Sequence, residues 1–360
     1  MRYFFHAASI LLLLSICFSC KPVGNGNGVE DVTQPKFLQI IDNDGALKAV
    51  SVSPFDGSRD TLAIDGPMDR LIVMSTSHIG FLEAIGRTGV IAGVSGLDYV
   101  YSQDVDAVDV GYDASPDYEK IVSLKPDLLL TYSVSAAKSP FITKLEQLGI
   151  RVFTVNEHLE SHPLARASYV RLFGALTGAM DKADSVLDAV RSSYTSLADS
   201  LASSIRNKRK VLLNIPYNDQ WFVPSESNYL TAMIRDAGGE VLGCEDGRTV
   251  SSVMSVEKAY SLSKDADCWM NVGWCSTMGQ LLSVNPVFGD MAGNIRSNAD
   301  AHGYAGMPVI WNDNRRLSPK GGNDIWESGV ARPDLVLRDI TSILHPSPAS
   351  PVPTYYLPLD

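Results

Sequence analysis

Short apolar runs and helically spaced apolar residues follow one another along the chain. In the first half, four apolar runs predict strands, at Leu71–Met74, Val90–Val94, Leu128–Thr131 and Arg151–Val155. A helix is expected over Phe141–Leu148, where Gly149 ends it. Strands that alternate with helices indicate a parallel sheet with helices on both faces. Before this pattern, two apolar runs flank Asp42–Gly45 and predict a β-hairpin.

One long helix is expected between the two halves. Its apolar stripe keeps a spacing of three and four residues, at Met180, Ala183, Leu187, Val190, Tyr194, Leu197, Leu201 and Ile205. Neither Pro nor Gly interrupts Ala179–Arg209, so the helix would span about 45 Å. Strand–helix alternation then restarts, with strands expected at Val211–Ile215, Gly239–Leu242, Cys268–Val272 and Val309–Trp311, and a last helix over Pro333–Leu344.

This order predicts an α/β fold. Two Rossmann-like lobes with parallel sheets would be joined by a single long rigid helix, with a ligand cleft between the lobes. The expected boundaries are an N-terminal lobe at 36–175, the linking helix at 176–209, a C-terminal lobe at 210–345 and an extended tail at 346–360.

The first residues predict an export signal. Arg2 precedes the apolar run Ile10–Ile16, and a small residue comes directly before Cys20. An apolar run this short suits a secretory signal better than a membrane span. We expect a bacterial lipoprotein signal at 1–19, lipidation of Cys20, and a flexible tether at 20–35 that holds the protein at a membrane. Ordinary signal cleavage is the alternative.

Charge and motifs exclude several classes of protein. The chain carries 30 Lys and Arg against 41 Asp and Glu, a net charge of −11, which does not suit a nucleic-acid binder. It has no P-loop, H-E-x-x-H or G-x-S-x-G motif, so we expect no enzyme. His158 and His162 are only a weak metal-binding pattern. After Cys20, the cysteines Cys244, Cys268 and Cys275 allow one disulfide at most.

Aromatic and polar side chains gather where the predicted strands end. Open α/β sheets bind ligands at the carboxyl ends of their strands. Aromatic loop residues on both lobes favour a cleft for a large, flat, partly apolar ligand. The candidate ligand-binding residues are Ser77, His78, Tyr99, Tyr112, Tyr132, Trp221, Phe222, Trp274, Asn314 and Arg315.

The two halves share the pattern E-K-x-x-S-L before a strand. It begins at Glu119 in the first half and at Glu257 in the second. Ser115–Pro116 and Ser255 are expected to begin the two helices, because serine caps a helix and proline suits its first position. Both glutamates would then lie in first turns of equivalent helices, which indicates a shared docking surface.

Several segments resemble the cluster A, or class III, substrate-binding proteins of ATP-driven importers for iron–siderophore complexes, haem and cobalamin. The second half is similar to a lipoprotein branch common in Bacteroidetes. The matching segments are Leu71–His78, Phe81–Gly86, Val110–Asp113, Tyr118–Leu128, Leu145–Val152, Trp221–Pro224, Asp236–Gly239, Gly322–Gly329 and Arg332–Asp334. The resemblance as a whole covers nearly everything from about residue 36 to the end.

The resemblance implies roles for particular residues. Glu119 and Glu257 fall where members of the family dock arginines of the permease, one lobe to each half. Tyr112 falls where haem-binding members carry a tyrosine that can ligate iron. The two lobes would move little on binding. Ser225–Asn228 departs from the glycine-rich segment usual in the branch, which leaves the ligand contacts of that loop open.

We therefore expect a monomeric, lipid-anchored lipoprotein of the periplasm without a resident cofactor. It would capture a ferric siderophore, haem or cobalamin and deliver it to an ABC permease dimer with its ATPase subunits. Two alternatives stay open. A zinc or manganese importer protein would need His78 near His158 or His302. A tetrapyrrole-acting enzyme would need a general acid–base group with a shifted pKa in the cleft.

Overall fold

A computed structural model describes residues 31–43, 45–245 and 250–359. Every helix and strand named below lies in the compact unit Val32–Asp360. The predicted signal, Cys20 and most of the predicted tether lie outside the described residues.

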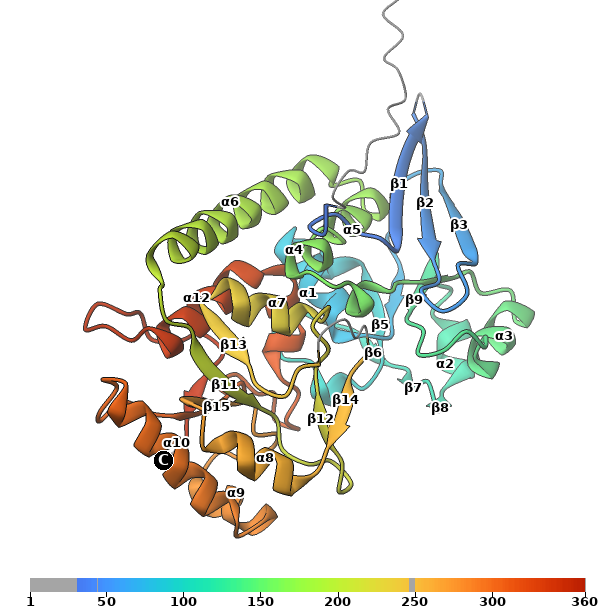
Figure 1. The fold of residues 1–360 in the computed structure, drawn as a ribbon. Helices are drawn as coiled ribbons and strands as arrows, with labels where there is room; N and C mark the ends of the chain where they lie inside the picture. The colour runs from blue at the N-terminus through green and yellow to red at the C-terminus, as the bar shows by residue number, and fades with distance from the viewer. Residues whose placement is uncertain (1–30, 44, 246–249, 360) are drawn as a thin grey trace, which may run out of the picture. The chain divides into compact units, whose positions relative to one another are not determined.

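The first half contains a parallel sheet with the strand order β10–β9–β4–β5–β6 (Figure 1). Its strands are β4 Leu71–Val73, β5 Ile91–Val94, β6 Val108–Asp109, β9 Leu128–Thr131 and β10 Val152–Thr154. The helices of this half include α1 Thr76–Ala84, α2 Tyr118–Ser123 and α3 Pro140–Gln147. The central strands β4 and β9 are buried along their whole length, as expected for a parallel sheet covered on both faces. The strands predicted here are confirmed.

The second half contains a sheet with the order β13–β11–β15–β16–β17, in which only β17 runs antiparallel to its neighbour among the described strands. Its strands are β11 Arg209–Leu213, β13 Gly239–Val241, β15 Cys268–Met270, β16 Ile310–Asn312 and β17 Leu357–Pro358. The helices include α7 Tyr229–Asp236, α8 Val256–Ser263, α9 Met278–Val284, α10 Phe288–Ala301 and α12 Pro333–Leu344. The C-terminal tail is therefore part of the sheet, and its Tyr355 and Tyr356 are buried.

Two smaller antiparallel ladders complete the strands described above. One is a ribbon of β12 Trp221–Val223 and β14 Ser252–Met254, and the other pairs β7 Gly111–Tyr112 with β8 Ser115–Pro116. The structure also shows an N-terminal antiparallel sheet of β1 Leu38–Asn43, β2 Ala46–Val52 and β3 Arg59–Ile64. The hairpin was expected, whereas β3 was not. This sheet is fastened to the first half by buried Glu160, whose carboxylate accepts the N–H groups of Lys36 at 2.9 Å and Phe37 at 3.0 Å.

The long helix between the halves is α6, Met180–Ser204. It packs on α5 Val170–Leu176 and on α12, with Leu187, Val190 and Tyr194 buried. The prediction that it continues to Arg209 was wrong, because the backbone becomes extended at Ile205 and Arg209 begins β11. With 25 residues the helix is about 38 Å long.

The two halves are also joined by direct packing. A single cluster of buried apolar residues runs from the first sheet to α12 and includes Leu71 and Leu344. Helix α1 lies against α11 Ser328–Ala331 so closely that a Cβ on Gly80 would be 1.9 Å from the carbonyl oxygen of Glu327. The carboxylate of Glu327 accepts the backbone N–H groups of Tyr101 at 2.9 Å and Ser102 at 2.8 Å. The linking helix is therefore not the only connection between the halves.

Candidate functional site

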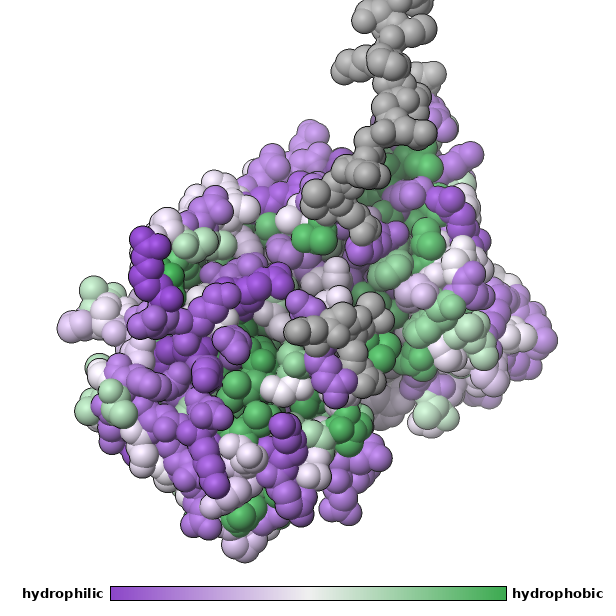
Figure 2. Space-filling view, in the orientation of Figure 1, coloured by the Kyte–Doolittle hydropathy of each residue, from purple (hydrophilic) through white to green (hydrophobic). Residues whose placement is uncertain are grey.

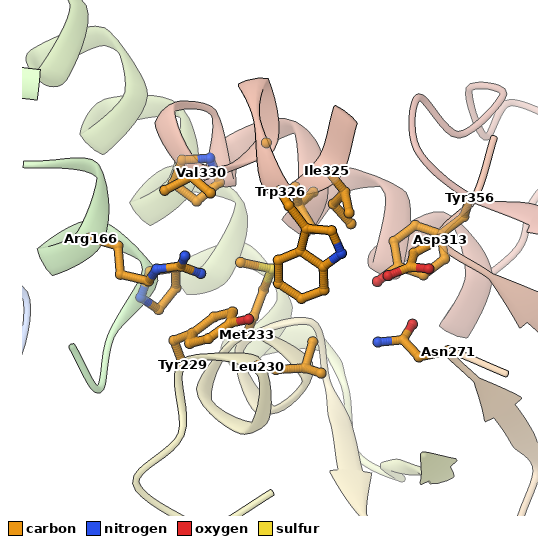
Figure 3. Close-up of a pocket in the computed structure, with 14 residues that line it drawn as sticks. Arg166, Tyr229, Leu230, Met233, Asn271, Asp313, Ile325, Trp326, Val330 and Tyr356 are labelled. Carbon is orange, nitrogen blue, oxygen red and sulfur yellow. The ribbon is translucent and has the colours of Figure 1, made fainter. Parts of the chain in front are cut away.

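A pocket lies where helices from both halves meet the carboxyl ends of β15 and β16 (Figure 3). Its volume is about 430 Å³, including space open to solvent. The first half contributes Pro163 and Arg166 from α4 Pro163–Ala167. The second half contributes Tyr229, Leu230, Met233, Asn271, Asp313, Ile325, Trp326, Gly329, Val330, Pro333, Val336 and Tyr356.

Arg166 brings a buried positive charge to this pocket. Its side chain lies over the ring of Tyr229, with 4.1 Å from the guanidinium carbon to the ring centroid. The residue is only 7% exposed, and its Nε has no hydrogen-bond partner within the described ranges. An arginine buried without full pairing is costly, and a carboxylate or another anionic group of a ligand would satisfy it.

Asp313 and Asn271 lie at the opposite end of the pocket. Figure 3 shows both directed into it, with the indole of Trp326 between them and Arg166. Burial raises the pKa of Asp313 to about 6. Asn271 follows β15 in a left-handed backbone conformation, with φ of 61°, and its Oδ1 is buried without a partner in the described part of the chain. From one end to the other, the pocket thus offers a cation, an aromatic face and an acid–amide pair.

A second polar group lies in the first half, where buried Ser77, His78 and Glu157 meet the partly exposed His158. Ser77 Oγ donates to Glu157 Oε1 at 2.6 Å. The other carboxylate oxygen of Glu157 lies 4.0 Å from His78 Nε2 and 4.0 Å from His158 Nδ1. Burial lowers the pKa of His78 to about 4, so its ring is neutral at pH 7. Ser77 and His78 are buried behind the protein surface and do not line the pocket.

The structure brings His78 and His158 to either side of Glu157, which was the arrangement that a metal site would need. Nevertheless, within residues 31–43, 45–245 and 250–359 no group of three or more His, Cys, Asp or Glu side chains is placed to hold a metal ion. His302 lies elsewhere, with its Nδ1 2.6 Å from Asp267 Oδ1.

Several of the other predicted ligand residues are exposed aromatic side chains. Tyr99 and Tyr112 form a pair with ring centroids 6.4 Å apart, and each is nearly half exposed. Phe222 and Trp274 are exposed on the second half, Trp274 by 62%. On the face seen in Figure 2, hydrophobic residues gather around the middle, between hydrophilic surfaces. These rings offer apolar surface outside the pocket.

The remaining predicted residues have different surroundings. Tyr132 contacts the ring of His158 at 5.9 Å and lines a separate cavity. Asn314 donates from Nδ2 to Ser276 Oγ at 2.8 Å, and Arg315 is exposed. The predicted ligand-binding residues are thus distributed over both halves, and none of them lines the pocket that contains Arg166.

Trp221 belongs to the core. It is wholly buried, stacks on Trp269 with 5.8 Å between ring centroids, and donates from Nε1 to the carbonyl oxygen of Leu213 at 2.8 Å. A ligand could reach its ring only after this cluster is unpacked. Its neighbour Phe222 points to the other face of β12 and is exposed, as alternation along a strand requires.

Sequence reasoning missed the pocket residues Arg166, Tyr229, Asn271, Asp313 and Trp326. For two of them a signal exists, because Asn271 and Asp313 follow directly after buried strands, as the proposed ligand residues do. Arg166 carries no such signal, because it stands in an apolar segment that reads as a core helix.

Glu119 and Glu257 are exposed and occupy the second residue of α2 and α8 respectively. Ser255 Oγ accepts the N–H of Lys258 at 3.2 Å and caps α8, as predicted. In α2 the prediction was wrong: Asp117 is the cap, accepting the N–H of Lys120 at 3.0 Å. Ser115–Pro116 instead pairs with β7 as strand β8.

No disulfide joins Cys244, Cys268 and Cys275, the cysteines that the structure describes. Among the described helices, none is both long and apolar enough to cross a membrane.

Similar proteins were found by sequence. An uncharacterized lipoprotein of Methanocaldococcus jannaschii is 26% identical over 302 residues, which is 79% of this chain and 66% of that protein. An uncharacterized ABC transporter substrate-binding lipoprotein of Bacillus subtilis is 23% identical over 181 residues, 50% of this chain and 57% of that protein. The matched stretch thus spans less than two thirds of either relative.

Solved structures share the fold. A periplasmic heme-binding protein from Pseudomonas aeruginosa superposes with a TM-score of 0.59 at 17% identity, over 81% of this chain and 98% of that chain. The periplasmic vitamin B12-binding protein of Vibrio cholerae gives 0.56 at 14% identity, over 77% of this chain and 97% of that chain. The family model described as "periplasmic binding protein" matches residues 71–292, more than half of the sequence. The chain therefore belongs to the periplasmic binding protein family, as a binding protein rather than an enzyme.

Proposed function

We propose that this protein captures an iron complex (a siderophore or haem) or a corrinoid and delivers it to an ABC permease. The observation that carries this proposal is the pocket shared by the two halves, in which Arg166 and Asp313 face each other across the indole of Trp326. The similar proteins support the ligand class, because one is a heme-binding and another a vitamin B12-binding protein. The Bacillus subtilis relative, an ABC transporter substrate-binding lipoprotein, supports the transport partner.

The chemistry of the pocket fits a ligand with both anionic and apolar parts. Arg166 would pair with a carboxylate or a catecholate oxygen, and Asn271 and Asp313 would hold a hydrogen-bond donor. The enclosed space that could hold solvent is only about 30 Å³, so the pocket itself would take no more than an edge group of such a ligand. The exposed rings of Tyr99, Tyr112 and Trp274 would cover more of it. If the ligand is haem, Tyr112 is the residue that would ligate iron.

The proposed location of the protein in the cell rests on residues that lie outside the described structure. Lipidation of Cys20 would anchor the chain on the periplasmic side of a bacterial membrane, with the residues after it as a tether. Two relatives that are lipoproteins support this proposal. The narrower assignment to a lipoprotein branch common in Bacteroidetes stays a prediction.

Optical titration of the chain from Lys21 onward tests the ligand. Haemin, cyanocobalamin and a ferric catecholate are added in turn while tryptophan fluorescence and the ligand band are followed. We expect saturable binding of one of them, weakened about tenfold or more in Arg166→Ala, since a hydrogen-bonded charge is lost. Arg206→Ala, at an exposed arginine outside the pocket, is the matched control.

The outcome with each ligand has a distinct meaning. A shifted Soret band that is lost in Tyr112→Phe selects haem and assigns the iron ligand. Tight binding of cyanocobalamin or the ferric chelate selects the corrinoid or the siderophore. No binding of any of the three, together with thermal stabilisation by zinc, would overturn the proposal in favour of a metal importer protein.

A further inference from the structure

A second, larger cavity lies beside the first sheet, apart from the pocket with Arg166. Its volume is about 1510 Å³, including space open to solvent. One wall is formed by β2, β3 and the turn between them, and the other by the segment from Thr131 through α3 and by β10 (Figure 1 shows β3 and α3 on the same side of the molecule). Because β2 and β3 precede the residues 71–292 that match the family, this cavity has a wall that the family match does not include.

Serine hydroxyl groups supply much of the polar lining of this cavity. They come from both walls, with Ser51, Ser53 and Ser58 on one side and Ser133, Ser135 and Ser139 on the other. Asn156 joins the walls, since its Nδ2 donates to the carbonyl oxygen of Val52 at 3.3 Å while its Oδ1 accepts from Ser133 Oγ at 2.7 Å. Such a surface prefers a ligand that both donates and accepts hydrogen bonds, because covering hydroxyls with apolar groups costs free energy.

The charges lining the cavity favour a neutral ligand over an anionic one. Lys138 is occupied by Glu146, with Nζ 2.6 Å from both carboxylate oxygens. Arg59 donates from Nη2 to the Gln39 side chain at 2.7 Å. The lining therefore contains three carboxylates, Asp60, Asp113 and Glu146, against the two cations Arg59 and Lys138. Asp60, by contrast, forms no ion pair within the described ranges, and its carboxylate can accept hydrogen bonds from ligand hydroxyls.

The cavity also has an aromatic and apolar side. Tyr132 is half-buried, and its hydroxyl donates to Asp113 Oδ2 at 3.4 Å. Val134, Ala136 and Ala137 are exposed beside it. Sugars combine hydroxyl edges with an apolar C–H face, and they match hydroxyls, a carboxylate and an aromatic ring together.

We infer that this cavity is a second binding site, which takes a neutral saccharide between the N-terminal sheet and the loop 131–140. It is independent of the iron complex or corrinoid proposed for the main pocket. Asp60 and the exposed hydroxyls of Ser58 and Ser135 hold the sugar hydroxyls, and the ring of Tyr132 covers a C–H face.

The test is binding of glucose, N-acetylglucosamine, N,N′-diacetylchitobiose and the cationic glucosamine to the purified full chain in detergent. Saturation-transfer NMR and calorimetry measure it. We expect a neutral sugar to bind with a Kd of about 0.1 to 10 mM, as is usual when little apolar area is buried. Asp60→Ala should weaken binding about tenfold or more, since a hydrogen bond to a charged group is lost. Asp65→Ala, at an exposed carboxylate directly after β3 that does not line the cavity, should not.

A second variant fills the cavity without touching the core. Ala137 is exposed, so Ala137→Trp should fold normally and abolish sugar binding. Binding of none of the sugars to the unaltered chain overturns the inference, as does binding that neither variant changes. Binding of glucosamine alone overturns the neutral class. Titration of Asp60→Ala with haemin, cyanocobalamin and the ferric catecholate separates the two proposals, because it should match that of the unaltered chain.

Discussion

At the residue scale, the fold places several carboxyl groups where water solvates them poorly. Glu327 is 1% exposed, and burial raises its pKa to about 7, although the N–H groups of Tyr101 and Ser102 oppose this rise. Neighbouring Asp324 and Glu83 add to it through charge repulsion. The carboxyl group that connects the two halves therefore titrates near neutral pH.

The ionisation of Glu327 predicts a pH-dependent stability. Because its pKa is higher in the folded than in the unfolded chain, the folded state retains the proton between about pH 4.5 and 7. The contribution of this retained proton to the free energy of unfolding is complete below pH 4.5 and is lost as the pH rises through 7. We expect it to amount to at most about 3 kcal/mol. Urea unfolding at pH 5 and pH 8 should show a smaller pH difference for Glu327→Gln than for the unaltered chain; equal differences would contradict this.

At the element scale, the contact between α1 and α11 depends on Gly80. A side chain there would meet backbone atoms, which cannot rotate away as the end of a flexible side chain can. This contact brings the first helix of one half directly against a short helix of the other. It explains why the halves pack through a continuous apolar cluster rather than through α6 alone.

Gly80→Ala is expected to lower the free energy of unfolding by about 2 kcal/mol or more, because the new Cβ would overlap the carbonyl group of Glu327. Gly293→Ala is the matched control: it lies within α10, and no atom is within 4 Å of its Cβ position. That change should stabilise the protein by about 0.5 to 1 kcal/mol. Thermal unfolding measures both, and an unchanged Tm for Gly80→Ala would show that the helices can separate without cost.

At the scale of the whole molecule, the matched glutamates Glu119 and Glu257 bear on how the protein would dock on the proposed permease. Glu119 and Glu257 are exposed at the starts of α2 and α8, one on each half, and are free of ion pairs in the described part of the chain. If the protein docks on a permease with arginines on each subunit, these charges set the register of docking more than its strength.

The double variant Glu119→Ala, Glu257→Ala should therefore lose uptake of the transported ligand while ligand binding in the main pocket is unchanged. Each single variant should retain part of the uptake, since one half still docks. Uptake of the labelled ligand by cells that carry each variant measures this effect. A double variant with full uptake would reject these glutamates as the docking residues.

Much of the architecture follows from the sequence alone. The periodicity of apolar residues predicts several elements, because it reflects local backbone geometry. These are the strands around Leu71 and Leu128, the hairpin at Asp42–Gly45 and the long α6. The repeated E-K-x-x-S-L pattern also predicted the equivalent placement of Glu119 and Glu257. These features can be predicted without knowing which segments of the chain contact one another.

Only the tertiary structure decided which side chains form the pocket. Arg166, Asp313 and Trp326 come from separate segments of the chain, and the packing of α4 against α7 and α11 helps to bring them to one pocket. The sequence also could not assign Trp221 and Phe222, because adjacent aromatic residues on a strand face opposite sides and either side can be the core. Periodicity fixes the elements, whereas contacts between distant residues fix the site.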